Sequence, residues 1–130
     1  MAADRLISSG GPWESKIGYS RAVVAGDYVH VSGSTATVDG QLQHKGDAYG
    51  QTLVTFETVI AGALSKVGYT LADVVRTRVY LADAADMDRV GEAHGKVFGE
   101  IRPAATMLAG IQFINAEMLV EIEVDAWKRN

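Results

Sequence analysis

The sequence predicts an α+β domain in which two helices cover one face of a single β-sheet. Residues 118–126 alternate apolar with acidic side chains, which is typical of a strand with one buried face. Residues 47–67 instead repeat apolar side chains at helical spacing and contain no proline. With the other predicted elements these segments give the order β-β-α-β-α-β-β, in which each helix follows a strand. The 130 residues show no repeat or shift in composition, so we expect one domain spanning residues 1–130.

The first two strands are predicted as a hairpin. Residues 22–24 and 28–31 are rich in valine and flank the short turn Ala25-Gly26-Asp27. Strand alternation turns three side chains of the second strand away from the core, those of Tyr28, His30 and Ser32. Residues 33–46 contain three glycines and are predicted to form a loop.

The remaining elements follow from caps and breakers. Asp47 is the predicted N-cap of the first helix, and Gly68 ends it. Residues 74–83 are β-branched and predict a strand. A second helix begins at Asp83 or Asp86 and ends before Pro103. The segments 104–109 and 118–126 then predict the last two strands.

The sheet face without helices is predicted to be polar. The strand over 74–83 should turn Val75, Val79 and Leu81 toward the core. Its opposite face and that of the last strand then carry six polar side chains: Arg76, Arg78, Tyr80, Glu121, Glu123 and Asp125. Two helices cover one side only, so this polar face meets water or another subunit. Tyrosines among the charges favour a homo-oligomer with polar clefts.

The three acids of the last strand are the first candidates for chemistry. In one interpretation they pair across strands with Arg76 and Arg78. Each such pair stabilises the fold by less than about 1 kcal/mol. In the other, one acid lies in a cleft with little water, where burial raises its pKa toward about 6–7 and suits it to proton transfer. Pairing is the better interpretation for any single acid, and the residues alone leave both open.

Other chemistry has less support in the sequence. His94 lies on the apolar stripe of the second helix and is interpreted as a packing residue, while His44 has no partner at metal-ligand spacing. His30 and Ser32 share a strand face but are poorly placed as a base and a nucleophile. There is no cysteine, HExxH, GxGxxG or P-loop motif, so we expect no metal and no cofactor.

Charge and hydropathy bear on partners and location. The net charge is −4 and no basic run is present, so we expect no nucleic acid as partner. The chain shows no signal-peptide layout and no long apolar run, which predicts a cytoplasmic protein without membrane contact.

Five segments of the chain are IGYSRAV, VSGS, DVVRTRVYLAD, RPAAT and VEIEVDAW. In their order and spacing they resemble the RidA family, which is also called YjgF or L-PSP. The resemblance implies a chorismate-mutase-like fold and a homotrimer with three clefts between subunits. It also implies hydrolysis of reactive imines and enamines to a ketone and ammonia without a cofactor. A small-molecule substrate or ligand is therefore expected in the clefts.

The resemblance also implies roles for particular residues. Glu121 matches the first acid of the family's final EIE and is the expected proton-transfer residue. The predicted substrate-binding residues are Tyr19, Ser32, Gly33, Arg102 and Thr106. By local sequence alone, Arg102 and Thr106 are equally well explained as a helix end and a strand start.

Three positions depart from the family pattern. Ser20 occupies the position of a tyrosine in the family, with Tyr19 just before it. Ala105 occupies the position where the family's deaminases have an arginine that pairs with the substrate carboxylate, and Gly91 replaces a common asparagine. These differences imply an altered specificity, for an imine or enamine without a carboxylate. The alternative is a non-catalytic trimer that binds a small metabolite or a protein in the same clefts. A ribonuclease, which some family names suggest, fits poorly with the acidic charge.

Overall fold

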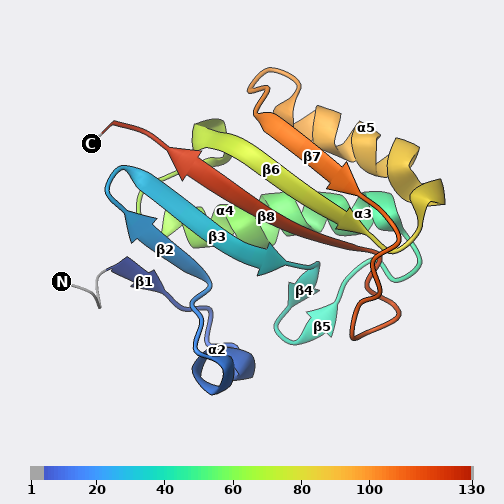
Figure 1. The fold of residues 1–130 in the computed structure, drawn as a ribbon, viewed down its shortest axis with the longest axis horizontal. Coiled ribbons are helices and arrows are strands. Elements are labelled where there is room, and N and C mark those ends of the chain that lie inside the picture. The colour runs from blue at the N-terminus through green and yellow to red at the C-terminus, as the bar shows by residue number, and fades with distance from the viewer. Residues whose placement is uncertain (1–4, 130) are drawn as a thin grey trace.

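The computed structural model describes residues 5–129, and its centre is a six-stranded mixed sheet in the order β1-β2-β3-β8-β6-β7 (Figure 1). The strands are β1 (Leu6–Ile7), β2 (Ala22–Ala25), β3 (Tyr28–Ser34), β6 (Val74–Leu81), β7 (Ala104–Leu108) and β8 (Val120–Trp127). Neighbouring strands are antiparallel except β6 and β7, which are parallel and joined by a helical crossover.

Two helical segments cover one face of this sheet (Figure 1). The first runs without a break through α3 (Ala48–Val54), the π-helical turn η1 (Thr55–Ile60) and α4 (Ala61–Ser65). The second is α5 (Met87–Phe98). The Phe56 and Phe98 rings join the two segments edge to face, with centroids 4.8 Å apart. The prediction of two helices on one face of the sheet is confirmed.

The seven predicted elements occur in the predicted order, but several short elements were not predicted. These are β1, α2 (Pro12–Ile17), β4 (Thr37–Val38), β5 (Gln41–Leu42) and the 3₁₀ turns η2 (Leu71–Asp73) and η3 (Ala84–Asp86). The predicted loop over 33–46 is therefore wrong in part. Its first two residues end β3, and β4 and β5 pair as a second, two-stranded sheet. Strands of two residues are too short for alternation to reveal them.

Two bulges shift the predicted faces. The pairing of β6 with β8 changes register between Val74 and Arg76, so that Val74 is buried and Val75 is 41% exposed. The prediction that Val75 faces the core is wrong, because the extra residue of a bulge reverses the alternation locally. A second bulge lies in β3 between Val31 and Ser34, both of which are buried.

The core lies between the helices and the sheet. His94 belongs to this layer, where its Nε2 is 2.9 Å from Thr77 Oγ1 and its ring contacts those of Phe56 and Phe98. The interpretation of His94 as a hydrogen-bonded packing residue is confirmed. In β8 the core-facing side chains are completely or almost completely buried: Val120, Ile122, Val124 and Ala126.

Candidate active site

The sheet face without helices carries the predicted polar row. Glu121, Glu123 and Asp125 of β8 are each half-buried on this face and alternate with the buried residues of the core. The final strand therefore presents its three carboxylates on one face, as its alternation predicts. Their surroundings then separate them into two groups.

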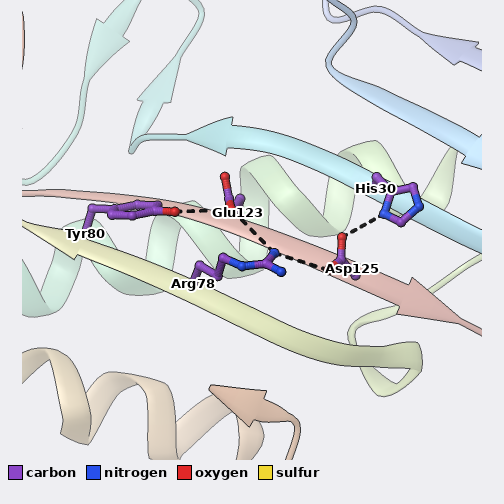
Figure 2. A network of polar contacts seen from close by, with 5 residues as sticks. All are labelled: His30, Arg78, Tyr80, Glu123 and Asp125. Atoms are coloured by element: carbon purple, nitrogen blue, oxygen red, sulfur yellow. Dashed lines mark hydrogen bonds and ion pairs between the residues drawn. The ribbon is translucent and has the colours of Figure 1, made fainter. Parts of the chain in front are cut away.

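Glu123 and Asp125 belong to a network of polar contacts (Figure 2). Arg78 Nη1 lies 3.4 Å from Glu123 Oε1 and 3.3 Å from Asp125 Oδ2. The Tyr80 hydroxyl donates to Glu123 Oε1 at 3.2 Å, and His30 Nδ1 lies 2.8 Å from Asp125 Oδ1. The cross-strand pairing interpretation is confirmed for these two acids and Arg78.

Arg76 does not take part in that pairing. It faces Asp125 in the ladder between β6 and β8, but within residues 5–129 it forms no ion pair. The predicted partnership of Arg76 with the acids is wrong, because Arg78 lies between Glu123 and Asp125 and reaches both.

Glu121 lies against the backbone of the β3 bulge instead. A Cβ atom built on Gly33 would overlap Glu121 Oε2 and would lie 3.1 Å from its Cδ. Any side chain larger than hydrogen at position 33 would therefore displace the carboxylate. The glycine and the bulge together make room for the Glu121 side chain beside β3.

Arg21, which precedes β2, is the positive charge that acts on Glu121. Its Nη2 donates to the Gly33 carbonyl oxygen at 2.5 Å, so the guanidinium is held at the bulge. Burial raises the pKa of Glu121 above the usual value of 4.5; the Arg21 charge opposes this rise, and the Glu123 charge adds to it. The result is a carboxyl group whose pKa is shifted toward neutrality.

Arg21 is a site residue that was not predicted from the sequence. It lies inside the quoted segment IGYSRAV, one position before a predicted strand. The available signal was a charged residue directly before a predicted apolar strand, inside a segment that resembles the family. Among residues 5–129 its buried Nε atom has no hydrogen-bond partner, so the guanidinium is only partly satisfied within the protomer.

Two further predicted residues lie beside Arg21. Ser32 Oγ donates to the Ser20 carbonyl oxygen at 2.6 Å, which ties the bulge to the segment before β2. The exposed Tyr19 ring has its centroid 5.9 Å from the guanidinium carbon of Arg21. The structure thus gathers Tyr19, Ser32, Gly33 and Glu121 around Arg21.

Arg102 and Thr106 lie in another part of the protomer. Thr106 is on the edge strand β7, where it is opposite Arg78 of β6. The strand β7 is two strand spacings, about 10 Å, from β8. Arg102 is exposed after α5, has a φ of 58°, and donates its backbone N–H to the Phe98 carbonyl oxygen. A single protomer therefore does not bring these two residues to Glu121.

Within residues 5–129 no three histidine, cysteine, aspartate or glutamate side chains are grouped as metal ligands. Over the same residues, no helix has the length and apolar character needed to span a bilayer.

Known proteins are similar to this chain over most of its length. The family model described as Endoribonuclease L-PSP matches residues 13–128. An uncharacterized protein of Streptomyces coelicolor is 44% identical over 126 residues, which cover 97% of this chain and 93% of that protein. The 3-aminoacrylate deaminase RutC of Acinetobacter baylyi is 32% identical over 105 residues, covering 80% and 82% of the two chains.

Solved structures give the same result for the fold. The crystal structure of a member of the YjgF/YER057c/UK114 family from Mycobacterium tuberculosis has a TM-score of 0.83 and 43% identity, and covers 95% of this chain and 98% of that one. The crystal structure of RidA from a Psychrobacter species has a TM-score of 0.75 and 25% identity. The match covers 96% of this chain and 95% of that chain. These similarities extend across the sheet and both helical segments.

Proposed function

The chain belongs to the Endoribonuclease L-PSP family, also called YjgF or RidA, and from this premise we propose that it hydrolyses small imines or enamines to a carbonyl compound and ammonia. The observation that carries the proposal is the position of Glu121 against the Gly33 backbone, with a raised pKa. A carboxyl group of this kind exchanges protons closer to neutral pH than an ordinary glutamate does.

The reaction needs one group that both accepts and donates a proton. The substrate reacts as the protonated imine. The Glu121 carboxylate accepts a proton from water as the water oxygen bonds to the imine carbon and the C=N π pair returns to nitrogen, which gives a neutral carbinolamine. The Glu121 carboxyl then protonates the amino nitrogen, and the C–N bond breaks with its electron pair leaving on ammonia. The hydroxyl proton passes back to the Glu121 carboxylate as the C=O bond forms, and then to ammonia, which leaves as ammonium. An enamine substrate first takes a proton from water on carbon, which gives the same protonated imine. Water and the substrate supply every atom, so no cofactor is required.

The cleft is proposed to lie between protomers of a homotrimer. In one protomer Tyr19, Ser32, Gly33 and Glu121 surround Arg21, whereas Arg102 and Thr106 lie near β7, too far away for one small molecule to contact both groups. A second protomer whose β7 edge lies beside β3 and β8 would complete the site. The partly satisfied polar face supports such an arrangement.

The substrate is proposed to lack a carboxylate. Ala105 is exposed on β7 and has no charge, so it cannot form the bidentate pair that an arginine makes with a carboxylate at this position in the resembled deaminases. The same observation favours the second candidate function, a trimer that binds a small metabolite or a protein in these clefts without turnover.

Ammonia release separates the two functions. Imines and enamines are generated in situ in matched pairs, with and without a carboxylate, and ammonia is measured against the uncatalysed rate. We expect release above that rate for the uncharged member of a pair and loss of this release in Glu121→Gln. Ammonia at the uncatalysed rate for every compound would reject the hydrolase and leave the binding function. Full turnover by Glu121→Gln would reject the assigned role of Glu121.

A further inference from the structure

A small cavity lies between β7 and α5, on the helix-covered side of the sheet. Its volume is about 160 Å³, and we call it the β7–α5 cavity. Its wall consists of Val79, Gly91, His94, Ala105, Thr106 and Met107. The rim residues Gly91, Ala105 and Thr106 are exposed, His94 and Met107 are half-buried, and Val79 is buried. The cavity therefore has an open mouth and an apolar floor.

The cavity exists because two of its residues are small. Gly91 has no side chain, and a Cβ atom built there would meet no atom within 4 Å. Ala105 contributes only a methyl group from the facing strand. A longer side chain at position 91 has open space to extend into, so the glycine leaves this part of the cavity empty.

The wall has no charged side chain. His94 is its one titratable residue, and burial lowers the pKa of the imidazole, which keeps the ring neutral at physiological pH. Its Nε2 is already paired with Thr77 Oγ1. A neutral imidazole still has a second ring nitrogen, which can donate or accept one hydrogen bond. An anion entering this cavity would lose hydration without gaining a positive partner.

We propose that the β7–α5 cavity binds an uncharged, mainly apolar group of the substrate that carries one hydrogen-bonding atom for His94. The size limit is about that of benzene, which an apolar protein cavity of about 150 Å³ can hold. The inference rests on the proposed function only in assigning this group to the substrate. It makes His94 a specificity-determining residue.

The test measures binding without turnover. Isobutyramide and isobutyrate have nearly the same shape and differ in charge, and the methyl group of Met107 reports on the cavity wall by ¹³C NMR. We expect isobutyramide to shift the Met107 signal with an affinity at least about tenfold higher than that of isobutyrate, because only the anion has a large cost of lost hydration. Equal or tighter binding of isobutyrate would overturn the proposal, as would a Met107 signal that responds to neither compound.

A matched pair of variants locates the binding. Gly91→Leu should fill the cavity and remove the Met107 response to isobutyramide. Gly95→Leu is the control, because Gly95 lies one turn further along α5, also has nothing within 4 Å of a built Cβ, and does not line the cavity. Equal loss in both variants would overturn the assignment to this cavity.

A third variant examines the polar contact. His94→Phe retains a ring beside Phe56 and Phe98 but removes the hydrogen bond, so isobutyramide should bind about five- to tenfold more weakly. Unchanged affinity would reject the role of His94. A chain that shows the Met107 response but releases no ammonia would retain the cavity as a binding site and would lose the proposed hydrolysis.

Discussion

Glu121 and Glu123 are two residues apart on β8 and point to the same face of the sheet, yet their neighbours differ in kind. Glu123 accepts hydrogen bonds from Arg78 and Tyr80, two side chains from the regularly paired part of β6. Glu121 lies against backbone, at the place where β3 departs from regular pairing around Gly33. Strand alternation thus produces the row of acids, whereas an irregularity in the neighbouring strand β3 gives Glu121 surroundings that differ from those of Glu123.

The two environments have different physical consequences. Glu123 accepts hydrogen bonds from two side chains of the neighbouring strand, which join β8 to β6. Beside Gly33, burial is the largest influence on Glu121, and it raises the pKa even though Arg21 opposes the rise. One end of the row is thus suited to holding strands together, and the other to exchanging protons.

The sharpest test of the comparison replaces each glutamate in turn. Glu121→Gln removes the exchangeable proton with little change of shape and should lower the ammonia-release rate by about 10²–10⁴-fold, the usual contribution of a general acid–base group. Glu123→Gln retains an acceptor for Tyr80 and should change the rate by less than about threefold. Steady-state ammonia release measures both. Similar losses in the two variants would mean that the two ends of the row do not differ in function.

A smaller effect is expected from Gly33→Ala. The added methyl group overlaps the Glu121 carboxylate and should displace it, and misplacing a catalytic group by about 1 Å costs up to about 100-fold in rate. The control is Gly62→Ala in α4, where a built Cβ meets no atom within 4 Å. Ammonia release and a thermal melt are recorded for both variants. A Gly33→Ala variant with full activity would show that the close approach to Gly33 is not needed.

Much of this comparison could be predicted from the sequence. The strict alternation of residues 118–126 predicts the acid row, and the apolar stripe around Phe56 and Phe98 predicts the helices behind it. The pairing of Arg78 with Glu123 and Asp125 follows from the same logic, because side chains on adjacent strands meet on one face. Regular elements are predictable where their period persists over several residues.

The irregular features could not be predicted in the same way. The bulges at Val75 and at Ser32-Gly33 depend on how two distant strands pair, and neither strand alone contains that information. The ladder also brings His30 opposite Asp125, a contact that the sequence analysis did not consider. Arg21 reaches the Gly33 carbonyl oxygen beside Glu121 only because the β2–β3 hairpin folds its start onto the bulge. The surroundings of Glu121 thus depend on long-range pairing.

The pH dependence of activity sharpens the account of Glu121. Burial raises its pKa, so the ionised base should form, and activity should rise, in a pH range above 4.5. Arg21→Gln removes the charge that opposes this rise, so the pKa should rise further and the ascending limb should move to higher pH. Near neutral pH we expect a loss of less than about tenfold, because only the ionised fraction falls. A pH–rate profile of kcat/KM measures the limb. A shift to lower pH would contradict the electrostatic role of Arg21.

The smallest effect is expected at the paired end of the row. Arg78→Met removes the cation shared by Glu123 and Asp125, but these groups are 39%, 34% and 23% exposed, and solvent weakens such pairs. The free energy of unfolding from urea titration should fall by about 0.5–1 kcal/mol at low salt and by less at about 1 M salt, where screening is strong. Arg89→Met, which removes a more exposed pair with Glu92 on α5, is the control and should cost less. A salt-independent loss of several kcal/mol would show that Arg78 holds the face together by packing rather than by charge.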